Sequence, residues 1–369
     1  MATRLSYPLM DGEASATTQR PTLAAVAALA GVSGSTASLA FSGAGPVSDS
    51  TRAKVLTAAQ TLGYAGPDPR AQSLRRGRSG IIGIVIEERL QDAFRDPMSL
   101  AMLDGIADET GNAGAGLLLL SDIGGPQLDI RSAPMDAVIL VGCSTRLDES
   151  VAVLRQRGMP VVAIEADDMP GVLSISLDNR DATARLARHL LDLGHESVAV
   201  VALPLDAAKE QQRLPANWDE LATSHTTRDR LRGLRDVYPG FGGIVATRSS
   251  IDAGRAAGLE LLEGADPPTA VVAQSDLLAM GVIRAAESLG IRVPEELSVV
   301  GFDGAQVDAM GSYDLTTVIQ PAVEKGRAAG RAAVELVEGG SPTPMAFTSE
   351  LHIGTTTAAR SQPERSRAG

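Results

Sequence analysis

Residues that commonly perform catalysis or hold metals are few in this 369-residue chain. Its four histidines (His189, His195, His225 and His352) lack the spacing of a metal-binding pair, and no glycine-rich phosphate loop ending in Gly-Lys-Ser or Gly-Lys-Thr is present. The single cysteine, Cys143, follows a predicted strand, where a small buried hydrophobe is more common than a nucleophile. We therefore expect no enzymatic activity, no cofactor and no bound metal.

Basic side chains, which bind phosphate groups, are unevenly distributed along the chain. The whole sequence has 33 Lys and Arg against 45 Asp and Glu, and its net charge of -12 by itself argues against a nucleic-acid partner. Residues 1 to 80 nevertheless hold eight basic and four acidic residues, giving +4, so the remainder carries -16. This asymmetry is typical of a small cationic module joined to a large acidic one, although charge alone leaves open a basic, solvated linker.

Three short helices are predicted between residues 22 and 63. Thr22, Ser33 and Ser48 are hydroxyl N-caps, and each precedes apolar residues at helical spacing. Gly31 and Gly63 stand where a left-handed residue ends the first and third helices. The turn between the first two helices is about three residues long and contains glycine, which is the helix-turn-helix arrangement.

A fourth helix of roughly two turns is predicted from Asp68, its cap, to Gly77, its stop, with Pro69 at the first helical position. A helix this short is marginal in water, so it needs a partner in order to form. Ala71 and Leu74 give it an apolar face between arginines, suited to packing against a twin helix. A leucine presented in this way can wedge into the minor groove of DNA.

The segment from residue 22 to residue 77 resembles the DNA-binding headpiece of the LacI/GalR repressor family. The matches lie at fixed offsets and include Ala30-Gly31-Val32-Ser33, Leu62-Gly63-Tyr64 and Ala71-Gln72-Ser73-Leu74. The resemblance implies that the helix from Gly34 to Ser42 enters the major groove and that Leu74 inserts into the minor groove. The DNA-binding residues that it implies are Thr22, Ser33, Gly34, Ser35, Thr36, Ser38, Leu39, Ser48, Arg52, Tyr64, Arg70, Ala71, Leu74 and Arg75.

The recognition helix departs from the family pattern. Leu39 and Ser42 stand where the family commonly has arginine and asparagine, and Gly34 and Ser35 are its first exposed positions. None of these residues makes the bidentate contact to guanine or adenine that arginine or asparagine makes. We therefore expect few base-specific contacts, made by Ser35 and Leu39. Phosphate contacts and the leucine wedge should supply most of the affinity for DNA, and this affinity should depend steeply on salt concentration.

From Ile81 onward, continuous Val/Ile/Leu runs alternate with amphipathic stretches. Continuous runs are typical of parallel strands buried on both faces, and their alternation with helices indicates doubly wound α/β sheets. A region of this size favours two lobes facing a cleft, with ligand at the carboxyl ends of the strands. The predicted strands are residues 81–86, 116–121, 137–141, 161–164, 173–175, 198–202, 244–247, 270–273 and 298–301.

This region resembles the effector domain of the same family, which is similar to periplasmic sugar-binding proteins. The matching pieces include Arg228-Asp229-Arg230-Leu231-Arg232-Gly233 and Asp276-Leu277-Leu278-Ala279-Met280-Gly281. By resemblance, Arg230 and Asp276 bind the ligand, since a guanidinium and a carboxylate clamp hydroxyls or a planar polar group. A salt bridge between the lobes remains the alternative for this pair. Further candidates for the effector site are Phe94, Met98, Glu165, Ser249 and Phe302.

A long polar insert, roughly Leu205 to Thr227, precedes the arginine motif. Covering the cleft and altering ligand choice are two roles open to it, but a disordered loop is the ordinary expectation for such a segment. The expected organisation is a mobile tail (1–20), a helix-turn-helix domain (21–66), a hinge helix (67–78), a first lobe (79–194 and 304–340), a second lobe (195–303 and 341–354) and a mobile tail (355–369).

The combination predicts a DNA-binding transcriptional regulator, a repressor whose operator affinity is set by a small effector such as a sugar or other metabolite. We expect a homodimer that places two headpieces on a pseudo-palindromic DNA operator, with no membrane contact. A solute-binding protein without DNA function is the alternative, but it leaves the cationic headpiece unexplained. The lone cysteine and the lack of a continuous apolar stretch in the first twenty residues favour a cytoplasmic location.

Overall fold

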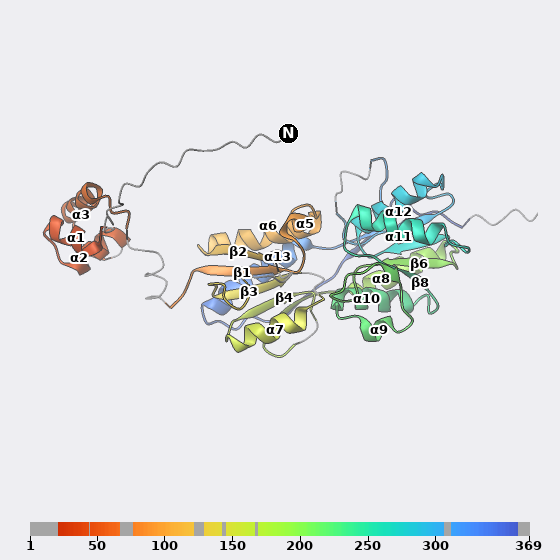
Figure 1. Cartoon of the computed structure of the whole chain (residues 1–369), viewed down its shortest axis with the longest axis horizontal. Coiled ribbons are helices and arrows are strands. Elements are labelled where there is room, and N and C mark those ends of the chain that lie inside the picture. Colours follow the sequence, from red (N-terminus) through yellow and green to blue (C-terminus); the bar gives the residue numbers. More distant parts are fainter. Residues whose placement is uncertain are drawn as a thin grey trace, which may run out of the picture. The chain divides into compact units, whose positions relative to one another are not determined.

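The computed structural model of the chain describes residues 21–43, 45–66, 77–121, 129–141, 145–166, 169–305 and 311–360. The chain divides into two compact units, which meet in sequence between Arg78 and Ser79 (Figure 1). The predicted N-terminal tail (1–20), residues 361–369 of the predicted C-terminal tail, most of the hinge helix (67–76) and Cys143 lie outside the described residues. The prediction of a mobile tail from residue 355 is wrong for residues 355–360, because Thr356 is fully buried and its hydroxyl donates to the Val299 carbonyl at 2.7 Å.

The first unit has three helices around a small core: α1 (Leu23–Ala30), α2 (Gly34–Ser42) and α3 (Asp49–Leu62). The three predicted hydroxyl caps are observed, because the side chains of Thr22, Ser33 and Ser48 each accept a hydrogen bond from the backbone N–H three residues later. Gly31 ends α1 in the left-handed conformation with φ 66°. The helices bury Val26, Ala27, Ala37, Ala40, Val55, Ala58 and Ala59 against one another.

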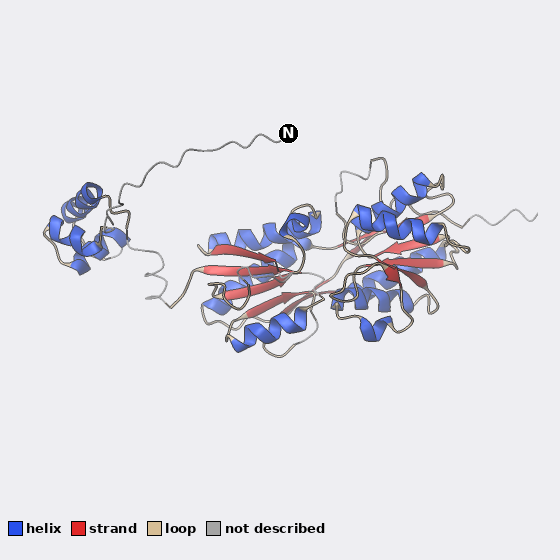
Figure 2. Cartoon of the chain, viewed as in Figure 1, coloured by secondary structure: helices blue, strands red, loops and turns tan. Residues whose placement is uncertain are grey.

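The second unit begins with a six-stranded parallel sheet in the order β12-β5-β4-β3-β1-β2. Helices α6 and α13 cover one face of this sheet and α7 covers the other (Figures 1 and 2). The short helix α5 (Leu90–Ala93) follows β1. The elements are β1 (Ile81–Ile86), β2 (Gly116–Ser121), β3 (Ala137–Val141), β4 (Val161–Ile164), β5 (Leu173–Leu177), β12 (Met345–Phe347), α6 (Pro97–Asn112), α7 (Leu147–Gln156) and α13 (Ala322–Val337).

Glycines set the spacing of α6 and α13. A Cβ atom on Gly105 would collide with the backbone carbonyl of Val323, and one on Gly326 would collide with that of Met102. The two helices therefore pack backbone to backbone. This fixes α13, and with it Lys325, relative to the first sheet.

The second lobe contains a five-stranded sheet in the order β10-β9-β6-β8-β7, in which only β7 is antiparallel to its neighbour. Helices α8, α9 and α10 share one hydrophobic core with it, and α11 and α12 share another on the opposite face (Figure 1). The elements are β6 (Val198–Ala202), β7 (Gln212–Arg213), β8 (Gly242–Val245), β9 (Ala270–Ala273), β10 (Ser298–Val300), α8 (Asn179–Asp192), α9 (Trp218–Leu221), α10 (His225–Arg235), α11 (Ile251–Leu262) and α12 (Asp276–Ser288).

The predicted lobe boundaries differ from the structure in two places. Helix α8 was expected in the first lobe, but its Leu186 and Leu190 belong to the core of the second, because they pack against Leu231 and Leu234 of α10. Strand β12 was expected in the second lobe, but it extends the first sheet beside β5. The chain therefore crosses between the lobes three times: directly after β5, between β11 (Thr317–Ile319) and α13, and after β12, where β13 (Glu350–His352) pairs with β11.

Within the described ranges, no single helix has the length and apolar character needed to cross a membrane. Helices α1 and α2 together reach that length, but they are bent by 103° relative to each other.

Candidate functional site

The recognition helix α2 presents hydroxyl groups at its start. Gly34 and Ser35 are exposed. The Ser33 hydroxyl lies 2.8 Å from the hydroxyls of both Ser35 and Thr36, so the cap and the first turn share one hydrogen-bonded cluster. Leu39 is 39% exposed on the same helix. These groups suit phosphate oxygens and a thymine methyl, and none is a bidentate donor for a base edge.

Two predicted DNA-binding residues, Arg52 and Tyr64, contact residues of α2. Arg52 of α3 donates from Nη1 to the carbonyl oxygen of Ala40 at 3.3 Å, which satisfies a free acceptor near the end of α2. The ring of Tyr64 meets the ring of Phe41 edge-on, with centroids 5.4 Å apart. The orientation of the recognition helix therefore depends on both residues. Arg70, Ala71, Leu74 and Arg75 lie outside the described residues.

A cavity of about 130 Å³ lies between the two lobes of the second unit. Several lining residues lie just beyond the ends of strands: Glu87 directly after β1, Thr145 four residues after β3, Glu165 directly after β4 and Leu203 directly after β6. This is the carboxyl edge of both sheets, where open α/β folds bind ligands. The other lining residues are Ile86, Glu88, Asp96, Met98, Ser99, Met102, Val141, Pro204, Lys209, Arg230, Thr247, Arg248, Ser249, Ser275, Asp303 and Gln320.

Arg230 of α10 is the central cation of this cavity and is only 2% exposed. Its Nη2 lies 3.8 Å from a carboxylate oxygen of Glu165 in the first lobe, and its Nη1 lies 3.7 Å from Asp303 Oδ1. Its Nε donates to the side-chain oxygen of Asn179 at 2.9 Å. Both ion pairs are longer than a hydrogen bond, so the guanidinium is held in place but is not clamped by either acid.

Glu165 directly follows β4 and links it to α10 and α13, and its backbone conformation is strained. Its backbone φ is +59°, unusual for a residue other than glycine. The fully buried ammonium of Lys325 in α13 donates to Glu165 and to Gln320. Burial alone would raise the pKa of Glu165, but the charges of Lys325 and Arg230 and the hydrogen bonds to the carboxylate lower it to about 2. This glutamate is therefore ionised across the physiological range.

Burial raises the pKa of other carboxyl groups of the cavity. For Glu88, burial together with the neighbouring charges of Asp96 and Asp92 raises the pKa to about 7. Burial also raises the pKa of Asp96. It raises that of Asp303 well above its ordinary value, despite the opposing charge of Arg230. The cavity thus combines an ionised glutamate with carboxyl groups able to donate or accept a proton in a hydrogen bond.

The structure brings together most of the predicted effector residues. Met98, Glu165, Arg230 and Ser249 line the cavity, and Phe302 lies directly beneath the guanidinium of Arg230. Phe94 is not among the lining residues and is 52% exposed.

Asp276 does not form the ligand clamp with Arg230 that the resemblance implied. Its carboxylate accepts hydrogen bonds from the Thr317 hydroxyl at 2.6 Å and the Ala305 backbone N–H at 2.7 Å, and it does not line the cavity. The acid that faces Arg230 is Asp303, which the sequence prediction missed. The sequence could have indicated Asp303, since this residue follows the predicted strand 298–301 at the carboxyl edge where ligands bind.

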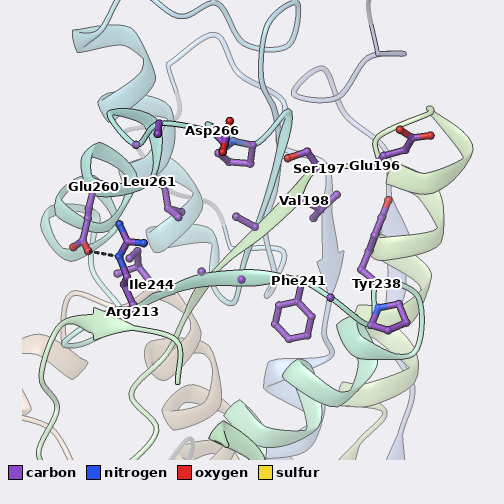
Figure 3. A pocket seen from close by; sticks show the side chains of 18 of the residues that line it. Glu196, Ser197, Val198, Arg213, Tyr238, Phe241, Ile244, Glu260, Leu261 and Asp266 are labelled. Atoms are coloured by element: carbon purple, nitrogen blue, oxygen red, sulfur yellow. Dashed lines mark ion pairs between the residues drawn. The ribbon is translucent and has the colours of Figure 1, made fainter. Parts of the chain in front are cut away.

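A larger hollow of about 850 Å³ lies at the opposite edge of the second sheet, at the start of β6 and β8 (Figure 3). Its arginines already face acids: Arg213 lies 4.0 Å from Glu260, and Arg360 lies 3.2 Å from Glu196. The hollow is open, and it lies at the amino ends of the strands. Position and buried charge therefore both favour the smaller cavity as the ligand site.

Comparison with known proteins matches both units. Residues 22–66 match the model of bacterial regulatory proteins of the lacI family, and residues 187–357 match a periplasmic binding protein-like domain. An HTH-type transcriptional regulator of Mycolicibacterium smegmatis is 34% identical over 358 residues, covering 92% of this chain and 96% of the relative.

Two solved structures are similar over nearly the whole chain. One is a LacI-family transcriptional regulator from Corynebacterium glutamicum, with 29% identity and a TM-score of 0.69, covering 92% of this chain and all of the other. The second is the complex of the transcriptional regulator CelR with cellobiose, with 26% identity and a TM-score of 0.62, covering 91% of this chain and all of that one.

Proposed function

Because the chain belongs to the LacI family and is a DNA-binding transcriptional regulator, we propose that it is a repressor controlled by a small molecule bound between its lobes. The position of Arg230 carries this proposal, since its buried guanidinium lies between Glu165 of one lobe and Asp303 at the carboxyl edge of the other. A ligand that binds to this group contacts both lobes and favours one lobe arrangement over another. The solute-binding alternative is set aside, because it gives no account of the matched headpiece.

The cavity favours a compact, uncharged, polyhydroxylated ligand. The pKa values of Glu88, Asp96 and Asp303 are raised, so this buried site already disfavours further negative charge, and this disfavours phosphorylated or carboxylated molecules. Carboxylates are strong acceptors for hydroxyl donors. No aromatic ring is present among the described lining residues, so stacking on a nucleobase has no support. The relative CelR was solved with cellobiose, which is a polyhydroxylated compound.

The effector site acts on DNA through a dimer in this proposal. Two copies associate through the second unit and place two headpieces on the half-sites of a pseudo-palindromic operator. Ligand binding changes the closure of the lobes. This alters the spacing of the two headpieces and the pairing of the hinge segments around Leu74, and so changes the affinity for the operator.

A thermal-shift screen of the full-length protein tests the ligand class. The screen contains neutral sugars and polyols, nucleosides, and the phosphorylated forms of the same sugars. We expect stabilisation by a neutral polyol and none by its phosphorylated form, with loss of the shift in Arg230→Ala. Stabilisation by phosphorylated compounds alone would contradict the proposed ligand class. A compound that stabilises the protein but leaves its affinity for DNA unchanged in a gel-shift titration would contradict the regulatory role.

A further inference from the structure

The insert at residues 205–227, which we call the strap, is an ordered part of the second lobe rather than a disordered loop. Its strand β7 pairs with β8, and the Leu214 N–H donates to the Gly243 carbonyl at 2.9 Å. Its Trp218 is buried in the hydrophobic core of that lobe. Figure 3 shows Arg213 of the strap beside Glu260 of α11 at one side of the larger hollow. The strap therefore moves together with the second lobe.

Four residues of the strap reach the first lobe. His225 and Thr226, at the start of α10, lie 3.9 Å from Asp148 and 3.4 Å from Glu165, respectively.

Lys209 and Thr223 make the contacts outside that helix. The ammonium of Lys209 lies 3.1 Å from the carboxylate of Glu87, and it also donates to the Glu87 carbonyl at 3.5 Å. The Thr223 hydroxyl donates to the Thr145 carbonyl at 2.8 Å. The backbone N–H and hydroxyl of Thr145 in turn donate to the Glu87 carboxylate. Glu87 and Thr145 thus form one receiving surface for Lys209 and Thr223.

The order of strands shows where these contacts act. The chain crosses between the lobes after β5 and after β12, at one end of the first sheet, and between β11 and α13, where Lys325 links Gln320 to Glu165 after β4. Glu87 and Thr145 follow β1 and β3, which lie two or more strands away from β5, a separation of about 10–15 Å. The strap therefore joins the lobes on the side that the crossovers leave open. Lys209 also lines the ligand cavity, so its ammonium is within reach of whatever fills it.

We propose that the strap is a latch that holds the two lobes closed over the cavity, with Lys209 and Thr223 as its contacts outside helix α10. This inference rests on the proposed ligand cavity. Lys209 suits the task, because its side chain is one-third exposed while that of Glu87 is 10% exposed, so the pair is shielded on one side and can still separate. Opening the lobes breaks these two contacts while the β7–β8 pairing stays intact.

Hydrogen–deuterium exchange of the full-length protein without ligand tests the latch. Lys209→Met removes the ammonium and keeps most of the apolar stem. We expect exchange of the peptide containing the Thr145 amide to become at least about fivefold faster, since that amide donates to the Glu87 carboxylate, which the Lys209 ammonium helps to hold in place. Exchange at Leu214 should not change, because its hydrogen bond lies within the second lobe. Arg213→Met is the matched control, since it removes a cation from the same strap without touching the first lobe.

A second pair of variants decides the matter if Lys209→Met disturbs the fold. Thr223→Val removes the hydroxyl that donates to Thr145 and should also speed exchange there, whereas Thr223→Ser keeps that hydroxyl and should restore protection. Unchanged exchange at Thr145 in both Lys209→Met and Thr223→Val overturns the latch. The measurement uses no ligand, so an empty thermal-shift screen would overturn the proposed ligand class and leave this result standing.

Discussion

The guanidinium of Arg230 lies flat over the ring of Phe302, with Cζ 3.6 Å from the ring centroid. Both side chains are almost fully buried. The ring covers one face of a cation whose edges point towards Glu165 and Asp303, so Phe302 positions the charge without lining the cavity itself. A ligand in the cavity therefore meets an arginine that is already oriented, which lowers the entropy cost of binding.

Replacing the ring of Phe302 should destabilise the protein. We expect Phe302→Leu to lower the free energy of unfolding by about 2–3 kcal/mol, from the lost cation–π contact and the vacated volume. It should also reduce any ligand-induced thermal shift. Phe241→Leu is the control, because this half-buried ring packs near Trp218 in the same lobe without a guanidinium over it. Equal losses in the two variants, measured by urea unfolding, would argue against a special role for the Arg230–Phe302 stack.

Replacing Asp303 should affect ligand binding, whereas replacing Asp276 should affect stability. Asp303→Asn keeps an acceptor for Gln320 but removes the charge that faces the guanidinium, so the ligand-induced shift should be largely lost. Asp276→Asn loses one acceptor for Thr317 or Ala305 and should destabilise the protein by about 1–3 kcal/mol, with the ligand-induced shift retained. Thermal shifts of both variants with the same neutral polyol check this assignment. Loss of binding only in Asp276→Asn would restore the clamp that the sequence suggested.

The raised pKa of Glu88 predicts a defined pH dependence of stability. Burial and the adjacent acids raise this pKa from 4.5 to about 7, so the fold prefers the protonated form. The resulting stability is fully present below pH 4.5 and is lost as the pH rises through 7. Glu88→Gln lacks this titration, so the wild type should lose stability relative to the variant between these two pH values. Urea unfolding of both proteins at pH 5 and pH 8 measures the difference, and a constant difference would show that Glu88 titrates normally.

DNA binding should depend on the hinge and on phosphate contacts more than on base readout. We expect Leu74→Ala to weaken operator binding at least about tenfold, because the wedge that stabilises bent DNA is removed. The logarithm of the affinity should fall steeply with the logarithm of the salt concentration. Leu56→Ala is a suitable control, since Leu56 is an exposed leucine of α3 outside the hinge. Gel-shift titrations on an operator selected in vitro with the full-length protein give both quantities, and unchanged affinity in Leu74→Ala would refute the wedge.

Local signals predicted much of the fold. Hydroxyl caps marked the starts of all three headpiece helices and glycine stops marked the ends of the first and third, since these signals depend only on neighbouring residues. The continuous apolar runs marked most of the parallel strands for the same reason. The comparisons confirm the two-part architecture and the regulatory function that the sequence indicated. The arginine motif led directly to Arg230, which lies within α10 and lines the cavity.

Features that depend on distant partners were not predictable. Lys325 lies in an amphipathic helix, where a lysine is expected at the surface, yet it is fully buried because Glu165, 160 positions earlier, receives it. The direction of the Asp276 side chain is set by Thr317 and Ala305, which the sequence does not mark. The strap is polar in sequence, but the contact of Arg235 with the ring of Trp218, 4.9 Å from guanidinium carbon to centroid, helps to order it.

Trp218 is the single tryptophan of the chain and lies within the strap. Its indole is therefore the sole source of tryptophan emission, and it is buried beside Arg235 and Phe241 in the segment that joins the two lobes. Tryptophan fluorescence of the unlabelled protein, excited where tyrosine does not absorb, thus reports on that segment alone. The wavelength and quenching of this emission show whether the strap stays packed on the second lobe, without an attached dye.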